Sequence, residues 1–113
     1  FAVTTLAGTP GMAGYVDGVG AAVRVPRPRG ITAAGSSIYF CEFNAHTIRQ
    51  VVTATGATST VVGTADTTGG STGGYAEGVG TAALIASPWG IAYHFPTRTI
   101  FFSDASRTIR RIQ

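Results

Sequence analysis

The sequence has no lysine, a single cysteine and no long apolar run. One cysteine excludes an internal disulfide and a cysteine-rich zinc site. No apolar run comes near the roughly 20 residues of a membrane-spanning helix, and no charged segment precedes an apolar stretch at the N-terminus, so we expect neither a membrane segment nor a signal peptide. The chain begins at Phe1 rather than Met, as expected for a processed, excised or designed piece.

The chain is instead rich in glycine, threonine, serine and short apolar stretches. Sixteen glycines and five prolines divide a sequence that is 44% hydrophobic and 12% charged. Many apolar residues with few charges indicate an ordered domain, and short apolar stretches between turn residues favour strands. Residues 18–25 allow at most one helical turn before Pro26. The predicted fold class is all-β.

An internal repeat organises the sequence. The motif GYVDGVG at residues 14–20 recurs as GYAEGVG at residues 74–80. The later segments PRGI, IYF and TIR recur in the same order as PWGI, IFF and TIR, and TLAG at residues 5–8 matches TVVG at residues 60–63. Such a repeat predicts stacked units that each supply one sheet.

Each repeat predicts a series of short strands. The expected strands cover residues 30–33, 38–42, 47–52 and 58–63 in the first repeat, and 90–93, 99–104 and 108–112 in the second. The second repeat lacks a fourth strand, whereas residues 2–7 carry the motif of one. Residues 38–41 and 100–102 are apolar at consecutive positions, which predicts strands buried on both faces.

Together these motifs resemble the NHL repeat of β-propellers, over nearly the whole chain and in two copies. The resemblance implies four-stranded blades in a six-bladed propeller. We expect residues 1–8 to be a fourth strand donated to a neighbouring chain's blade, residues 9–63 to form the first blade with the loop that leads into it, and residues 64–113 to form the second blade without its fourth strand. Three copies would supply six blades, so we expect a homotrimer.

The predicted contact between subunits is a strand pair. An unpaired strand edge and an uncovered apolar face favour association, and a head-to-tail contact can close as a ring. The residues expected to pair are Val3, Thr4, Thr5 and Leu6 of one copy with Thr108, Ile109, Arg110 and Ile112 of the next. We therefore expect a self-assembling scaffold.

Strand polarity places several polar residues on one face of the predicted disc. They are Arg24, Arg27, Arg29, Asn44, His46, Trp89 and Arg107. This face is the candidate surface for a protein partner. One alternative is a module that binds RNA or an acidic peptide there, because guanidinium groups suit phosphate. Another is a solvated loop in which one arginine pairs with Asp17 or Glu42.

Two carboxylate–arginine pairs recur at matched positions of the repeat. They are Glu42 with Arg49 and Asp104 with Arg110. Recurrence in both units indicates structural pairs that fix the turn between the second and third strands rather than a reactive site.

The sequence contains no recognisable catalytic set. Some NHL-like propellers are metal-dependent lyases that hold a metal through histidines near the central channel. His46 and His94 have no counterparts in the other repeat, and a metal site needs further ligands. We therefore expect no metal, no cofactor and no enzymatic activity. Cys41 lies in an aromatic strand and is expected to be a small buried hydrophobe.

Overall fold

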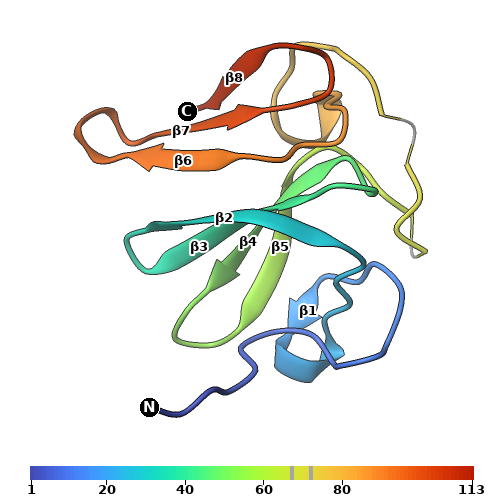
Figure 1. Ribbon diagram of the computed structural model, residues 1–113, viewed down its shortest axis with the longest axis vertical. Coiled ribbons are helices and arrows are strands. Elements are labelled where there is room, and N and C mark those ends of the chain that lie inside the picture. Colours follow the sequence, from blue (N-terminus) through green and yellow to red (C-terminus); the bar gives the residue numbers. More distant parts are fainter. Residues whose placement is uncertain (67, 72) are drawn as a thin grey trace.

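The chain folds into two antiparallel sheets that lie side by side (Figure 1). The computed structural model describes residues 1–66, 68–71 and 73–113. Sheet 1 has the strand order β1-β5-β4-β3-β2, and sheet 2 has the order β6-β7-β8. The strands are β1 (Gly18–Val19), β2 (Pro28–Ala34), β3 (Ser37–Glu42), β4 (Thr47–Val52), β5 (Ala57–Val62), β6 (Ile91–His94), β7 (Thr99–Ser103) and β8 (Ile109–Ile112).

The expected all-β class is confirmed, and β2 to β8 lie within a residue or two of their predicted positions. Sheet 2 has three strands in the described residues, so β8 is an edge strand with one unpaired side. Residues 18–25, which allow at most one helical turn, contain the 3-10 turn η1 (Gly20–Ala22). It has a counterpart in η2 (Gly80–Ala82), and a third such turn, η3 (Phe95–Thr97), joins β6 to β7.

The N-terminal segment has no strand partner within the described part of the chain. Residues 2–7 were expected to be a strand donated to a neighbouring chain, and they pair with no strand of this one. Phe1 and Val3 are fully exposed. The strand β1, which was not expected, pairs instead with the outer edge of β5 through Gly18↔Thr58 and Val19↔Ala57.

The main core lies between the two sheets. Sheet 1 contributes Cys41, Ile48 and Val62 to it. The second repeat contributes Ala83, Ile85 and Phe102. Each sheet therefore buries apolar surface by packing on its neighbour, which is the stacking that a repeat implies.

The predicted burial on both faces is found in β3 but not in all of β7. Phe40 and Cys41 are adjacent in β3 and both are buried. In β7, Phe102 is buried, whereas Phe101 stays 38% exposed. The expectation fails at Phe101 because its side chain points to the face of β7 opposite Phe102, and no third sheet covers that face in the described part of the chain (Figure 1).

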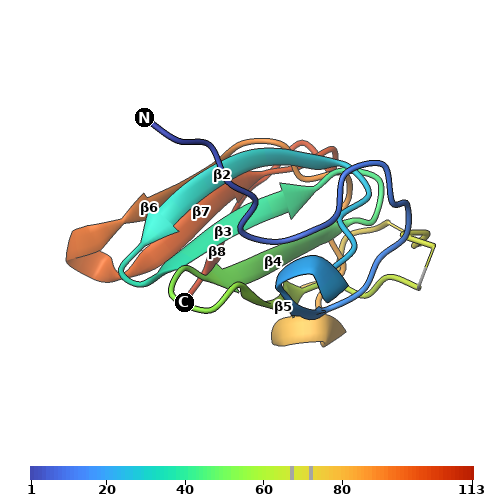
Figure 2. The ribbon, with the colours of Figure 1, turned by 90° about the horizontal axis from the view of Figure 1, so that it is seen from below.

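The edge strands β2 of sheet 1 and β6 of sheet 2 lie next to each other. The backbone N–H of Gly30 donates to the carbonyl oxygen of Trp89 at 3.0 Å, and the N–H of Tyr93 donates to Thr32 Oγ1 at 3.1 Å. Figures 1 and 2 show the two chain ends on opposite sides of the pair of sheets. Among the helical segments that the structure describes, none has the length and apolar character to cross a membrane.

Candidate functional site

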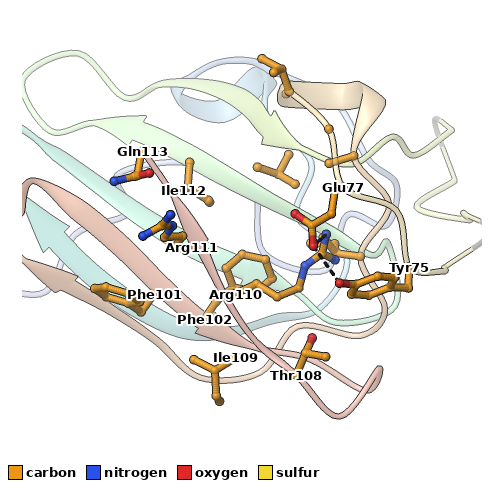
Figure 3. A pocket seen from close by; sticks show the side chains of 16 residues that line it. Tyr75, Glu77, Phe101, Phe102, Thr108, Ile109, Arg110, Arg111, Ile112 and Gln113 are labelled. Atoms are coloured by element: carbon orange, nitrogen blue, oxygen red, sulfur yellow. Dashed lines mark hydrogen bonds and ion pairs between the residues drawn. The ribbon is translucent and has the colours of Figure 1, made fainter.

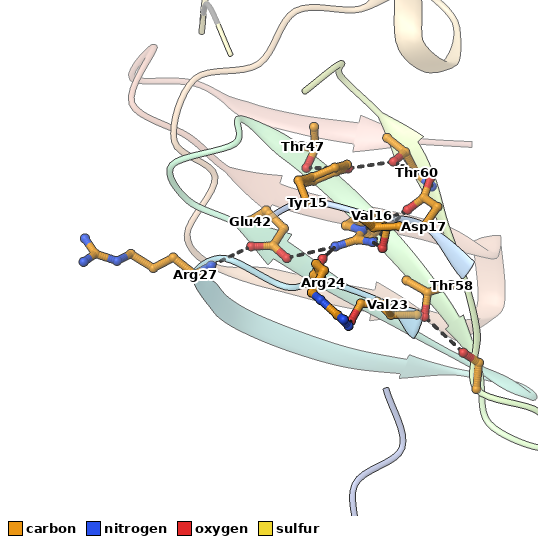
Figure 4. A network of polar contacts seen from close by, with 12 residues as sticks. Tyr15, Val16, Asp17, Val23, Arg24, Arg27, Glu42, Thr47, Thr58 and Thr60 are labelled. Carbon is orange, nitrogen blue, oxygen red and sulfur yellow. Dashed lines mark hydrogen bonds and ion pairs between the residues drawn. The ribbon is translucent and has the colours of Figure 1, made fainter. Parts of the chain in front are cut away.

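Arg49 on β4 is completely buried and lies at the centre of a network of polar contacts, which Figure 4 shows. Its Nε and Nη2 donate to Asp17 Oδ1 at 3.1 and 2.8 Å, and its Nη1 lies 3.3 Å from Glu42 Oε1. The remaining donors reach backbone carbonyls, Arg24 O at 2.7 Å and Val16 O at 2.8 Å. A guanidinium can be buried in this way only because its donors are satisfied.

Tyr15 closes the Arg49 cluster from one side. Its ring centroid lies 4.2 Å from the guanidinium carbon of Arg49, within the range of a cation–π contact. Its hydroxyl donates to Thr47 Oγ1 at 3.1 Å and lies 2.6 Å from Thr60 Oγ1. Asp17 Oδ2 accepts from both the N–H and the hydroxyl of Thr60, at 3.0 and 2.9 Å. The cluster thus ties residues 15–24 to three strands of sheet 1.

The second repeat builds a matching cluster around Arg110 on β8. Arg110 Nη1 donates to Leu84 O at 2.6 Å, and Nη2 donates to Ala76 O at 2.9 Å. Asp104 lies 3.5 Å from the guanidinium, Glu77 lies 3.9 Å from it, and the Tyr75 ring centroid is 4.8 Å from its central carbon. Because each partner occupies the repeat position of one in the Arg49 cluster, the arrangement is a property of the repeat.

The equivalent carboxyl groups of the two clusters have opposite pKa shifts. Burial raises the pKa of Glu42, and the backbone N–H of Arg27 and the charge of Arg49 offset only part of that rise. Burial also acts to raise the pKa of Asp104, but hydrogen bonds from Ser106 and Ala86 outweigh it and leave the pKa below its usual range. The turn after β7 therefore holds an ionised carboxylate more firmly than the turn after β3.

Beside the Arg110 cluster, sheet 2 carries a groove of about 510 Å³, which Figure 3 shows from close by. The groove lies between the free edge of β8 and residues 78–80, and Val62 and Ile85 also line it. Tyr75 and Glu77 line the groove too, and the Tyr75 hydroxyl donates to Glu77 Oε1 at 2.8 Å, with Tyr75 itself 55% exposed. In sheet 1 the corresponding place, between β4 and β1, is occupied by β5.

The arginines of the candidate partner face have different surroundings. Arg24 is turned into its own loop, where Nη1 donates to the carbonyls of Ala21 and Val23 at 2.6 and 2.9 Å. The side chain of Arg27 is exposed and points away from the Arg49 cluster (Figure 4). The alternative in which a loop arginine pairs with Asp17 or Glu42 is not what the structure shows, because both carboxylates bind the guanidinium of Arg49.

Arg29 joins the two sheets on this face. Its guanidinium carbon lies 4.8 Å from the Trp89 ring centroid and 5.4 Å from that of Phe43. The two rings meet edge to face at 5.4 Å. Trp89 remains 56% exposed, so the Arg29–Trp89–Phe43 cluster presents a cation and an aromatic surface to solvent.

Of the other predicted residues of the face, Asn44 and His46 line one pocket together with Pro26 and Ser87, whereas Arg107 does not line it. Asn44 and Arg107 are exposed. His46 is half-buried, and its Nδ1 accepts the N–H of Ser87 at 2.8 Å, which fixes the segment that leads into β6. His46 therefore has a structural role that its position in the sequence did not predict.

The remaining reactive residue types are separate from one another. Within residues 1–66, 68–71 and 73–113, no three His, Cys, Asp or Glu side chains gather in a metal-binding group. His94 is exposed, with Nδ1 2.7 Å from Thr97 Oγ1. Cys41 is completely buried, and burial raises the pKa of its thiol to about 12, which keeps it protonated and unreactive near neutral pH.

Sequence reasoning missed the partners that complete the arginine clusters. Tyr15 and Asp17, with Tyr75 and Glu77, supply the aromatic and outer carboxylate contacts. The signal was present, because GYVDGVG and GYAEGVG repeat an aromatic and an acid two residues apart. The motif predicted the repeat but not these side-chain contacts.

The sequence matches no protein-family model and none of the curated proteins. Its structure is similar to part of an auxiliary nutrient binding protein from Bacteroides thetaiotaomicron, with a TM-score of 0.79 and 30% identity over 95% of this chain and 27% of that chain. A protein of unknown function from the same bacterium has a TM-score of 0.80 and 21% identity over 94% of this chain and 26% of that chain. A candidate phosphatase, also from that bacterium, has a TM-score of 0.79 and 23% identity over 96% and 26%.

The chain thus spans about a quarter of the length of each solved chain that it matches. What it shares with them is an all-β arrangement that forms part of larger β-propeller-like proteins.

Proposed function

We propose that the chain is a non-enzymatic scaffold, two blades of an NHL-like propeller that self-assemble and present a loop face to a protein partner. In this proposal sheet 1 and sheet 2 are successive blades. The observation that carries the proposal is the Arg49 cluster and its copy around Arg110. Both clusters use their charged groups to hold loops against strands, which is a structural role.

The contact between the sheets supports assembly. Each repeat carries the residues for this contact, but within the described part of one chain only the first repeat makes it. Gly30 of the first repeat donates to the carbonyl of Trp89 in the second. The same position of the second repeat is Gly90, and an added Cβ there would meet nothing closer than Ser103 Oγ at 3.3 Å. The exposed Phe101 lies on this open side of sheet 2. A further blade packed there would make the contact that Gly30 makes within the chain.

Three copies would supply the six blades that the NHL resemblance implies. Multi-angle light scattering of the 113-residue chain across a concentration series tests this directly. The proposal predicts a mass three times the 11.5 kDa of one chain. A persistent monomer at high concentration would overturn self-assembly, and a dimer or tetramer would overturn six-blade closure.

Gly90→Ala provides the matched test of the packing contact. In one isolated chain the added methyl has room beside the rotatable Ser103 hydroxyl. In the assembly it would meet a backbone carbonyl of the next copy, as a Cβ on Gly30 would meet Trp89 O at 2.4 Å. The variant should keep the circular dichroism of the wild type and lose the trimer. A trimer formed as readily as the wild type would contradict this packing.

A second candidate function is binding of single-stranded RNA at the same face, favoured by the Arg29–Trp89–Phe43 cluster. A base can stack on an exposed indole while arginine contacts phosphate. Anisotropy of a labelled oligonucleotide should then fall steeply with added salt. The double variant Arg27→Ala and Arg29→Ala should abolish the signal.

Arg98→Asn is the control for this second candidate. Arg98 sits in the left-handed turn between β6 and β7, at φ 52°, where asparagine is tolerated. It removes a positive charge at the opposite end of the strands. Equal loss of binding in the control and the double variant would show that net charge alone is responsible, and a labelled acidic peptide would distinguish peptide from RNA binding.

A further inference from the structure

The main structural difference between the two repeats is at the position of the fourth strand. In sheet 1 this position is filled by β5, which pairs on one side with β4 and on the other with β1. In sheet 2 the strand that corresponds to β4 is β8, and the residues that correspond to β1 are 78 and 79. Between them lies the groove of about 510 Å³.

The register of β5 shows what this groove is shaped to hold. Thr60 pairs with Arg49, and Thr58 pairs with both Val51 and Gly18. The backbone N–H and the hydroxyl of Thr60 both donate to Asp17. A strand in the groove of sheet 2 therefore needs a threonine opposite Arg110 to satisfy Glu77 and Tyr75 in the same way.

The N-terminal segment has such a threonine, because TLAG at residues 5–8 aligns with TVVG at residues 60–63. The residues that follow these two segments already make equivalent contacts. Thr9 Oγ1 donates to the carbonyl of Ala21 at 2.8 Å, and Thr64 Oγ1 donates to that of Thr81 at 3.1 Å.

The preceding glycines, Gly8 and Gly63, both have positive φ, at 99° and 84°. The backbone that follows residues 2–7 therefore packs against η1 in the same way that the backbone that follows β5 packs against η2. Residues 2–7 therefore emerge where the fourth strand of a preceding blade would emerge, and they have no strand partner in the described part of this chain.

We propose that the fourth-strand groove of sheet 2 binds residues 2–7 of a second copy of this chain, antiparallel to β8. This inference rests on the proposed self-assembly and specifies its register. Transferring the β5 register places Thr5 opposite Arg110, Thr4 opposite Arg111 and Val3 opposite Ile112. The Thr5 N–H and hydroxyl donate to the Glu77 carboxylate, and Tyr75 contacts the same hydroxyl.

Matched threonine variants of the full chain test the recognition. Thr5→Val keeps the size and β propensity of the residue but removes the donor to Glu77. Its neighbour Thr4 corresponds to the exposed Ser59, so Thr4→Val is the control. Thr5→Val should weaken assembly at least about tenfold in the midpoint concentration, the size of one hydrogen bond to a charged group. Thr4→Val should leave the midpoint within about twofold.

Cysteine pairing tests the register independently of stability. A chain with Val3→Cys mixed with a chain with Ile112→Cys should form a disulfide-linked pair under mild oxidation, because directly opposite residues fall within disulfide range. Thr4→Cys mixed with Ile112→Cys should not, because adjacent residues of a strand point to opposite faces. The native Cys41 is buried and does not compete.

The synthetic peptide FAVTTLAG, residues 1–8, completes the test as a competitor. In excess it should lower the mean mass of the assembly, and the same peptide with valine in place of Thr5 should not. If trimers form but neither the peptide nor Thr5→Val affects them, self-assembly stands and this strand exchange is wrong. If the chain stays monomeric and the peptide does not bind it, both are wrong.

Discussion

Sheets 1 and 2 derive from the same repeat but differ in how fully their arginine clusters are enclosed. In sheet 1, Arg49 and Glu42 are both completely buried, and β5 supplies Thr60 to the outer carboxylate. In sheet 2, Arg110 is 9% exposed and Glu77 is 79% exposed. Nearly identical residues thus form a sealed cluster in one sheet and an open one in the other, and the neighbouring strand makes the difference.

Some contacts of the two arginines are encoded by the repeat itself, and others are added by a neighbouring strand. The contacts of each arginine with two loop carbonyls are the same in both sheets. The contacts that depend on the fourth strand exist in sheet 1 only. The open cluster in sheet 2 therefore reflects the absence of a fourth strand beside β8 among the described residues rather than a weaker sequence.

The largest effect should come from removing the buried arginine. Arg49→Met leaves Glu42 and two loop carbonyls without their partner, and we expect a loss of about 3–5 kcal/mol in the free energy of unfolding. Arg110→Met should cost only about 1–3 kcal/mol, because its outer ion pair with Glu77 is solvated. Urea denaturation followed by circular dichroism measures both, and equal losses would contradict the comparison.

A smaller effect should follow from adding one methyl to equivalent glycines. Gly30→Ala forces a Cβ to within 2.4 Å of Trp89 O and should cost about 1–3 kcal/mol. Gly90→Ala should cost about 0.5 kcal/mol or less at concentrations where the chain is monomeric. Thermal unfolding of both variants at low concentration checks the difference, which would vanish if the sheets did not pack through β2 and β6.

The two turn carboxyl groups, Asp104 and Glu42, should contribute to the free energy of unfolding with opposite dependences on pH. The pKa of Asp104 is lowered on folding, so its contribution is present above the ordinary aspartate pKa near 3.9 and is lost as pH falls through the folded pKa. The pKa of Glu42 is raised on folding, so its contribution is present below the ordinary glutamate pKa and is lost as pH rises through the folded pKa.

Urea unfolding from about pH 3 to pH 7 checks these signs against Asp104→Asn and Glu42→Gln. The stability advantage of wild type over Asp104→Asn should shrink on acidification. Its advantage over Glu42→Gln should shrink as pH rises. Slopes of the same sign for both variants would show that the two turns are electrostatically alike.

The smallest effect is expected at Cys41, whose repeat counterpart in sheet 2 is Ser103. Because the thiol is buried and its pKa is about 12, iodoacetamide should leave it unmodified in the folded chain and alkylate it in denaturant. Intact-mass spectrometry provides the measurement. Rapid alkylation without denaturant would mean that the space between the sheets opens readily.

The sequence predicted the strands well because turn residues bracket short apolar segments, as at residues 47–52. It did not predict β1, since a two-residue strand that contains Gly18 carries no periodic signal. It placed Phe101 in the interior because consecutive apolar residues do not show which neighbour is present. The loop arginines also differ, since only the structure shows Arg24 bound to its own backbone and Arg29 set against two aromatic rings.

Amide hydrogen exchange of β4 and β8 across a concentration series tests the central claim most directly. At low concentration the amides of β4 should be protected on both sides of the strand, whereas the outward amides of β8 should exchange rapidly. Raising the concentration should slow exchange in β8 and in residues 2–7 together, until β8 resembles β4. Concentration-independent exchange in β8, with residues 2–7 never protected, would contradict the account.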